Sequence, residues 1–313
     1  MKQIGKILLY LIATVVLGAL LAPPLYWLGQ AVLHYGAQHG LVSFHEVKGH
    51  SVATGPLAFL SQKFRRYFDR AILVAAFVFL WPLVRSLKIR SWKELGLEQN
   101  PCRWRQFILG LLISIGSVAL LGLVAIQYGG YAFYSPIPWK QIALLPFSAL
   151  AVAVIEETLF RGVLQGVVQR ASTRGAAFLF VPALYAIVHF LKPPGDAFAQ
   201  TSIGWGSGFV QTLLAMRQFA DPKMVAGGLL TLFVVGIILG YARLRTRSLW
   251  LPVGLHAGWI IAKMGFTKIA RGNGSGWPLF GGDLLTGLAP LLVVMLTGIV
   301  VWWWMMRNLR AET

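Results

Sequence analysis

The stretch Ala151-Val-Ala-Val-Ile-Glu-Glu-Thr-Leu-Phe-Arg161 decides the fold of this chain. It places two carboxylates and one guanidinium inside an apolar run that covers residues 139–169. A charged side chain in the middle of a bilayer is costly, so such groups usually face the interior of a helix bundle and usually have a function. The stretch therefore predicts a membrane-spanning helix whose polar side is turned toward other helices.

The composition of the whole chain agrees with a membrane protein. Of the 313 residues, 57% are apolar or aromatic and 12% are charged, whereas soluble domains carry about 25% charged residues. A mostly apolar run of about 18 residues is long enough to cross a hydrocarbon layer of about 30 Å as a helix. We expect an all-α polytopic transmembrane bundle of about eight spans, at residues 7–29, 68–86, 105–128, 139–169, 175–191, 225–242, 249–266 and 284–306.

Two of these spans have unusual features. The first begins like a signal peptide, but Pro23 and Pro24 follow its small-residue end directly, and proline disfavours cleavage there. We therefore expect a retained anchor with a kink. The fourth run is too long for one straight crossing, so it either begins as an interfacial helix near Trp139 or tilts.

Two connections are long. Residues 30–66 form the longest polar connection, and residues 193–223 contain several glycines and prolines. Within the second connection Phe209, Leu213 and Met216 repeat at intervals of three and four residues, which favours a short helix at the membrane interface. A plain surface loop is the alternative.

The charge pattern points to a lipid bilayer as the partner. The net charge is +18, from 28 Lys and Arg against 10 Asp and Glu. The basic residues lie between the apolar runs, where lipid headgroups favour them, so we do not expect a nucleic-acid partner. The dense short loops 85–105 and 243–247 favour a cytoplasmic N-terminus in the cell membrane. The single cysteine, Cys102, excludes an internal disulfide framework and a cysteine-based zinc site.

Few ionisable groups lie inside the predicted spans, and they are the candidates for a site. Of the ten carboxylates only Glu156 and Glu157 lie deep in an apolar run. Glu157 and Arg161 are four residues apart, so they share a helix face as an ion pair. Glu156 is rotated by about 100° from its neighbour and stays available as a general base. The alternative is a buried network that joins helices without any chemistry.

Two histidines also lie inside predicted spans. His189 follows Tyr185 by four residues, so the two share a helix face, and His256 stands between Gly254 and Gly258, which allow close helix approach. A single intramembrane histidine often serves only packing. Together with the glutamate pair, however, the two supply a second proton carrier and a donor for an oxyanion.

These residues form three motifs in a fixed order. Glu156-Glu157-Thr-Leu-Phe-Arg161 is an E-E-x-x-x-R motif, the segment from Tyr185 to His189 is an aromatic-x-x-x-His motif, and His256 stands in a Leu-His-Ala context. Over residues 139–265 the chain resembles the CPBP family, the CAAX prenyl proteases and bacteriocin-processing enzymes, also called the Abi family. The resemblance implies a helix bundle around a polar cavity and endopeptidase activity near the C-terminus of a substrate.

The resemblance also implies roles for the site residues. Glu156 and His189 would activate a water molecule, and His256 would stabilise the oxyanion. Two positions depart from the family pattern, because Tyr185 stands where phenylalanine is usual and Ile260 stands where asparagine is usual. We expect residues 1–104 to hold the anchor, the polar loop and the second span, 105–138 the third span, 139–265 the catalytic core and 266–313 the last span.

A metal is the open alternative for the chemistry. Glu156, His189 and His256 resemble the three-ligand set of a catalytic zinc site, but the H-E-x-x-H spacing of helical zinc peptidases is absent from the sequence. We expect no cofactor, with zinc as the alternative.

Three functions compete on this evidence. The first is an intramembrane endopeptidase acting on a membrane-associated, prenylated or other peptide substrate. The second is a non-catalytic scaffold or immunity-type protein, and the third is a proton-coupled transporter with Glu156 as its proton site. The sequence is compatible with a monomer.

Overall fold

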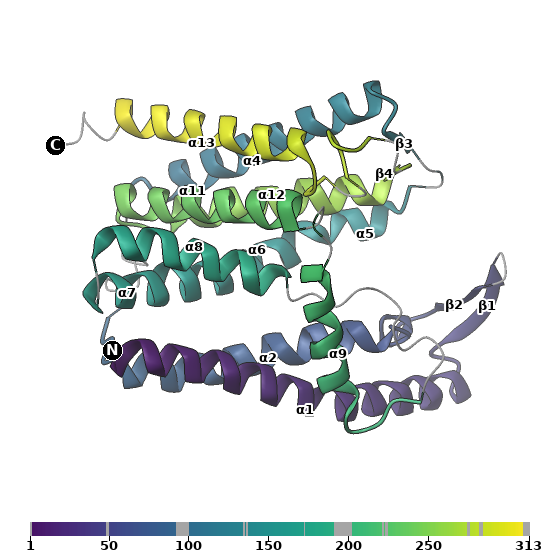
Figure 1. The fold of residues 1–313 in the computed structure, drawn as a ribbon. Helices are drawn as coiled ribbons and strands as arrows, with labels where there is room; N and C mark the ends of the chain where they lie inside the picture. Colours follow the sequence, from purple (N-terminus) through teal and green to yellow (C-terminus); the bar gives the residue numbers. More distant parts are fainter. Residues whose placement is uncertain are drawn as a thin grey trace. The chain divides into compact units, whose positions relative to one another are not determined.

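The computed structural model describes residues 2–47, 50–91, 100–133, 135, 137–171, 173–190, 202–220, 222, 225–273, 276–281 and 284–308. Its chain is almost entirely helical (Figure 1). Two compact units are present: the larger comprises Met1–Ile4, Val84–Phe190 and Phe219–Thr313, and the smaller comprises Gly5–Leu83 and Leu191–Gln218.

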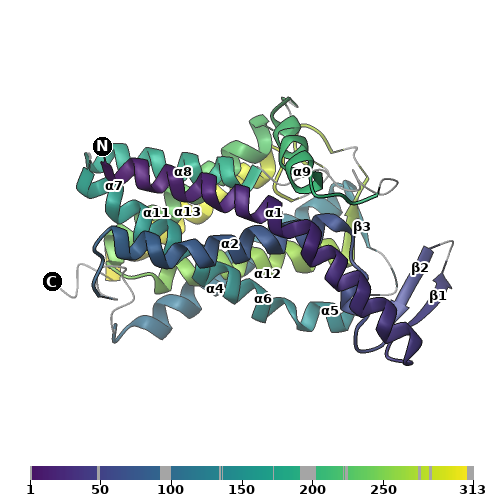
Figure 2. The same ribbon diagram turned by 90° about the horizontal axis from the view of Figure 1, so that it is seen from below.

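The smaller unit is built on two long helices that run side by side (Figure 2). They are α1 (Lys2–Gln38) and α2 (Phe64–Ser86), and a hairpin of β1 (Ser43–Val47) and β2 (His50–Thr54) followed by η1 (Ala58–Leu60) connects them. Gly18 lets the backbone of α1 approach Ile72 on α2, since a methyl group at position 18 would collide with that side chain.

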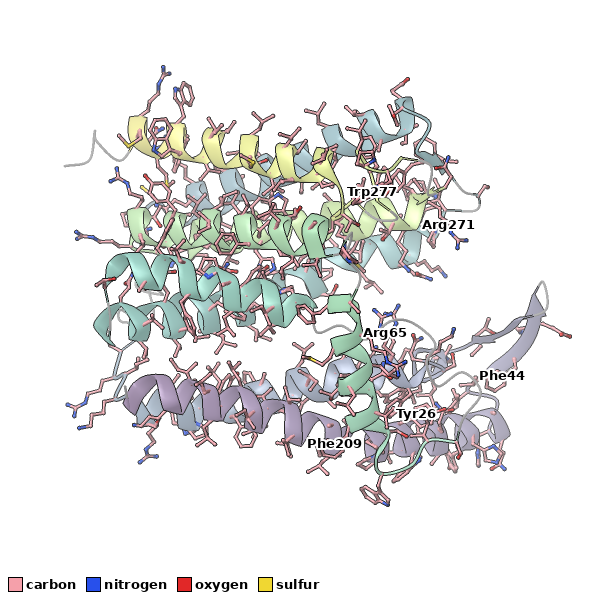
Figure 3. The ribbon with its side chains drawn as sticks, in the orientation of Figure 1. Tyr26, Phe44, Arg65, Phe209, Arg271 and Trp277 are labelled. Atoms are coloured by element: carbon pink, nitrogen blue, oxygen red, sulfur yellow. The ribbon has the colours of Figure 1, made fainter. Side chains whose placement is uncertain are left out.

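Aromatic side chains complete this unit. Tyr26, which is labelled in Figure 3, makes edge-to-face contacts with Phe64 and Tyr67, with ring centroids 5.7 and 5.3 Å apart. The helix α9 (Ser207–Met216) packs on α1 through Gly208, whose missing side chain leaves room for the backbone oxygen of Ala19.

The larger unit contains the remaining elements. They are α4 (Arg103–Gln127), β3 (Tyr131–Phe133), α5 (Trp139–Ala143), α6 (Leu145–Glu157), η2 (Thr158–Leu164), α7 (Gln165–Ala171), α8 (Arg174–Phe190), η4 (Val225–Leu229), α11 (Leu230–Thr246), α12 (Trp250–Ile269), β4 (Ala270–Gly272) and α13 (Leu288–Asn308). The short η3 (Arg217–Ala220) follows α9 in the chain. Helix α12 has an interior position, because it packs against α4, α6 and α11.

Glycines explain why α12 and α4 lie so close. A methyl group at Gly254 would meet the backbone oxygen of Phe107, and one at Gly110 would lie 2.7 Å from the backbone nitrogen of Leu255. At Gly258 it would meet the hydroxyl of Ser114. Small residues at these positions let the two backbones touch, which is a common way of packing helices within a membrane.

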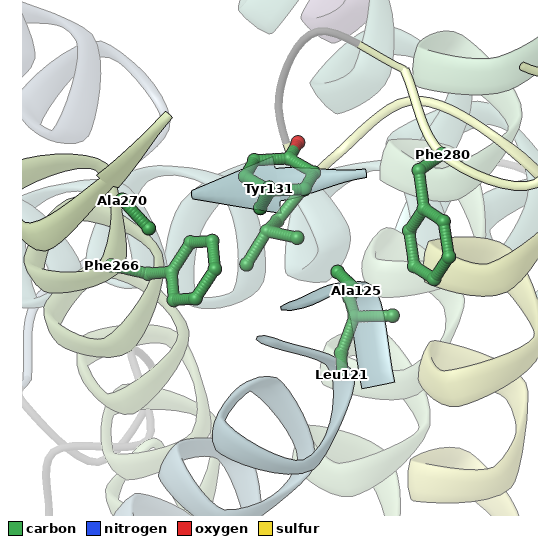
Figure 4. Close-up of a cluster of buried hydrophobic side chains, with 7 residues drawn as sticks. Leu121, Ala125, Tyr131, Phe266, Ala270 and Phe280 are labelled. Atoms are coloured by element: carbon green, nitrogen blue, oxygen red, sulfur yellow. The ribbon is translucent and has the colours of Figure 1, made fainter. Parts of the chain in front are cut away.

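One end of the larger unit is closed by an apolar cluster (Figure 4). Phe266 at the end of α12 packs with Tyr131, whose hydroxyl donates to the backbone oxygen of Gly281 at 3.2 Å. Strands β3 and β4 pair there in antiparallel fashion, with Tyr131 opposite Gly272. The cluster members are Leu121, Ala125, Tyr131, Phe266, Ala270, Phe280 and Leu284.

The predicted all-α polytopic bundle is confirmed, and each of the eight predicted spans overlaps a helix. In the described residues six helical stretches are long and apolar enough to cross a membrane, namely Gly5–Gln38, Phe64–Ser86, Arg103–Gln127, Trp139–Gln169, Val225–Thr246 and Leu288–Asn308. The other two predicted spans are α8, which is short, and α12, whose His256 and Lys263 lower its hydropathy.

The predictions for single segments agree with the structure in part. A short helix does begin at Trp139, and α9 does form where the three-and-four spacing predicted a helix. The first helix, however, runs through Pro23 and Pro24 as far as Gln38, and residues 43–54 form a hairpin. The predicted polar connection at 30–66 is therefore shorter than expected, because the helix continues past the apolar run that signals it.

Candidate active site

The two glutamates lie where the regular helix α6 gives way to the π-helical segment η2. Helix α6 ends at Glu157, and residues 158–164 continue with the wider i→i+5 hydrogen bonding. Within this segment Arg161 turns back toward Glu157, and its Nη1 donates to Glu157 Oε1 at 2.7 Å. Both side chains are buried, as the four-residue spacing predicts for an intramembrane ion pair.

His256 approaches the same carboxylate from α12. Its Nδ1 lies 2.8 Å from Glu157 Oε1, so the carboxylate accepts hydrogen bonds from two helices. A carboxylate oxygen can only accept, and Nδ1 therefore carries the ring proton. The other ring nitrogen, Nε2, faces Glu156 Oε2 at 3.8 Å and the hydroxyl of Tyr185 at 3.4 Å. The sequence predicted the pairing of Glu157 with Arg161. It gave no sign of the hydrogen bond between Glu157 and His256.

His189 is oriented by its own helix. Its Nδ1 lies 2.9 Å from the backbone oxygen of Tyr185, one turn earlier on α8, so Nδ1 carries the proton here too. Its Nε2 lies 3.0 Å from Glu156 Oε2. The Glu156 and His189 side chains are 19% and 13% exposed, against 5% for His256, so water can reach this pair most easily.

Tyr185 joins the two histidines and the ion pair. Its ring is fully buried, and the Arg161 guanidinium lies over it at 4.4 Å from the centroid. Phe160 contacts it edge-on at 5.2 Å. The ring of His189 also packs against it, at a centroid distance of 4.0 Å. These contacts fix the direction of the phenol hydroxyl.

Two polar contacts anchor the π-helical region on α11. Arg161 Nη2 lies 3.5 Å from the backbone oxygen of Gly236, and Gln165 Nε2 donates to the backbone oxygen of Gly240 at 3.2 Å. The two side chains are four residues apart, as are the two glycines, so the contacts form a short ladder between the two segments. Gln165 was not among the predicted residues, since a single buried amide gives no signal in a sequence.

The protonation of the cluster follows from its charges. Two ionised glutamates and Arg161 leave one negative charge, and Glu156 Oε2 and His189 Nε2 would both be acceptors at 3.0 Å. One proton held by these two groups makes the cluster neutral. A neutral set is favoured in a low-dielectric bundle, where an uncompensated charge costs several kcal/mol.

The same three groups could hold a metal ion. Ligand atoms of Glu156, His189 and His256 all lie within 4.8 Å of one another. Each histidine also donates its Nδ1 proton to a backbone oxygen or a carboxylate, the usual outer support of a metal ligand. The residues therefore fit a zinc ion with one open position.

Comparison with protein families gives a match over part of the chain. Residues 138–262 match the family described as type II CAAX prenyl endopeptidase Rce1-like. This segment is Rce1-like. The match confirms the resemblance to the CPBP family that the three motifs indicate. No match was found among curated proteins or among solved structures.

The Rce1-like segment contains every side chain of the cluster. The structure brings all six predicted site residues together, which are Glu156, Glu157, Arg161, Tyr185, His189 and His256. Ile260, one turn beyond His256 on α12, contributes no polar atom. The match over residues 138–262 and the long apolar helices agree with a multi-pass membrane protein that has an Rce1-like segment.

Proposed function

We propose that this chain hydrolyses a peptide bond of a membrane-associated substrate, prenylated or otherwise lipid-anchored, with a water molecule activated by Glu156 and His189. The observation that carries the proposal is the 3.0 Å contact between His189 Nε2 and Glu156 Oε2, with the other nitrogen of the ring held by a backbone oxygen. The Rce1-like family supports the reaction class.

The proposed reaction uses one proton that the cluster already holds. A water molecule in contact with the two groups donates a proton to Glu156 as its oxygen attacks the peptide carbonyl. The carbonyl electrons move to the oxygen, which becomes an oxyanion on the side of His256. The proton on His189 then passes to the leaving nitrogen as the C–N bond breaks. Glu156 is thus the general base and His189 the general acid.

The remaining charged residues position this machinery. Glu157 fixes the ring of His256 through Nδ1, and Arg161 neutralises Glu157 while supporting the ring of Tyr185. We propose that the reaction needs no metal, since a positioned carboxylate suffices to activate water. A bound zinc ion would supply Lewis-acid activation of the same water.

The test is cleavage by the purified, detergent-solubilised chain. A panel of fluorogenic peptides, with and without a prenylated cysteine near the C-terminus, supplies the substrates. Glu156→Gln and His189→Gln should each lower kcat by about 100- to 10,000-fold, while Glu46→Gln, a carboxylate change on the exposed hairpin, should leave it unchanged. A wild-type protein that binds these peptides without cleaving them would contradict the proposal and favour the non-catalytic scaffold.

A further inference from the structure

We infer that the hydroxyl of Tyr185 is a hydrogen-bond donor to the oxyanion, and thus a further catalytic residue; the inference rests on the proposed endopeptidase function. His256 in its neutral form lacks such a donor. Its Nδ1 proton is committed to Glu157 at 2.8 Å, so a neutral ring has no hydrogen on the Nε2 that faces the site.

The phenol hydroxyl is a donor that needs no change of charge. It lies 3.4 Å from His256 Nε2, and this nitrogen lies 3.8 Å from Glu156 Oε2. That distance is long for a hydrogen bond from a hydroxyl, since O–H···O bonds are most often about 2.7–2.8 Å long. Little is therefore lost when the hydroxyl hydrogen rotates about the C–O bond from His256 toward a developing oxyanion.

The rest of the residue is held in place. Arg161 lies over the ring, Phe160 contacts its edge, and the backbone oxygen of Tyr185 anchors His189. A donor that is fixed before the reaction costs no reorganisation when charge develops, and a single such donor contributes about 100- to 1,000-fold in kcat. The proton stays on the phenol throughout, so the atom and charge balance of the hydrolysis is unchanged.

Position 260 offers an independent way to replace this donor. Ile260 stands four residues after His256 on α12, so an amide there would project beside the imidazole. Isoleucine has no hydrogen-bond donor in its side chain. The Tyr185 hydroxyl therefore contributes more to stabilising the oxyanion than it would beside an asparagine at position 260. Ile260→Asn should therefore act mainly when that hydroxyl is missing.

The experiment compares wild type, Tyr185→Phe, Ile260→Asn and the double variant on the same peptide. Tyr185→Phe keeps the ring and removes one oxygen, so we expect kcat to fall about 100-fold or more with KM within about twofold. Adding Ile260→Asn to Tyr185→Phe should recover at least about tenfold in kcat, and adding it to wild type should do much less. Tyr241→Phe on α11, away from the cluster, is the matched control and should change nothing.

The possible outcomes separate the proposed function from the donor role of Tyr185. If wild type hydrolyses none of the peptides, the proposed function fails and the donor role fails with it. If wild type is active and Tyr185→Phe keeps its kcat, only the donor role is wrong. A loss in Tyr185→Phe that appears as a lower melting temperature, or that Ile260→Asn does not repair, would assign Tyr185 a packing role and overturn the inference.

Discussion

Glu157 is the side chain on which the geometry of the site depends most, although it is not the proposed base. It accepts from Arg161 at 2.7 Å and from His256 at 2.8 Å, and it is completely buried. Glu156, one residue earlier, is the more exposed carboxylate and faces His189. In the proposed mechanism, two adjacent residues of the same type therefore serve stability and chemistry separately.

This division can be measured with two isosteric variants. Glu157→Gln should reduce stability by about 3–5 kcal/mol, because it leaves Arg161 as an uncompensated buried charge. Glu156→Gln should remain folded and inactive. Abundance by fluorescence-detected size-exclusion chromatography and the melting temperature of each purified variant provide the comparison. Equal losses of abundance would contradict the division of roles.

The metal alternative is also decided at the level of single residues. We expect wild type to keep its activity after treatment with a chelator and to carry no stoichiometric zinc by elemental mass spectrometry. His189→Ala should leave that metal content unchanged. Loss of activity on chelation, restored by added zinc, would instead assign Glu156, His189 and His256 as ligands.

At the level of the helices, the contact between α4 and α12 positions His256. Gly254→Ala should destabilise the protein by about 1–3 kcal/mol, since the new methyl group meets the backbone of Phe107 and that backbone cannot rotate away. The shift of α12 should also lower kcat. Gly116→Ala on α4 is the matched control, because a methyl group there meets nothing within 4 Å.

The control should be neutral or stabilising by up to about 1 kcal/mol, as expected for glycine to alanine in a helix. Thermal unfolding of both variants in the same detergent gives the difference directly. If the two glycines respond alike, close helix packing is not what holds His256 in place.

Periodicity and chemistry account for what could be predicted. The apolar runs indicated the helices, and the rarity of charge in apolar runs selected Glu156, Glu157, Arg161, His189 and His256. Contacts between helices left no such signal, so the bond between Glu157 and His256 was missed. Nor does a sequence reveal that η2 is a π-helix, because its residues have ordinary helical propensities.

For the molecule as a whole, the orientation in the membrane is the outstanding prediction. The chain has one cysteine, Cys102, between the second and third predicted spans. Labelling of this cysteine therefore reports on which side of the membrane the connection lies. With a cytoplasmic N-terminus, Cys102 lies inside the cell. A membrane-impermeant maleimide should not label it in intact cells and should label it in inverted vesicles.

A double variant tests the loop that is predicted to lie outside the cell. Cys102→Ser combined with Thr54→Cys moves the thiol to an exposed residue at the base of the hairpin, between the first and second spans. This variant should be labelled in intact cells. The reverse pattern in the two proteins would show that the basic residues of loops 85–105 and 243–247 do not lie inside the cell, and that the predicted orientation is wrong.

The π-helical turn also has a consequence for comparing genes. Because its hydrogen bonds close over five residues instead of four, the segment 158–164 accommodates one more residue than a regular helix of the same height. A relative that is one codon shorter here would have an uninterrupted α-helix and would present its arginine at a different angle to the glutamates. A single-residue gap in this segment is thus a marker by which relatives with and without the Glu157–Arg161–His256 network can be sorted.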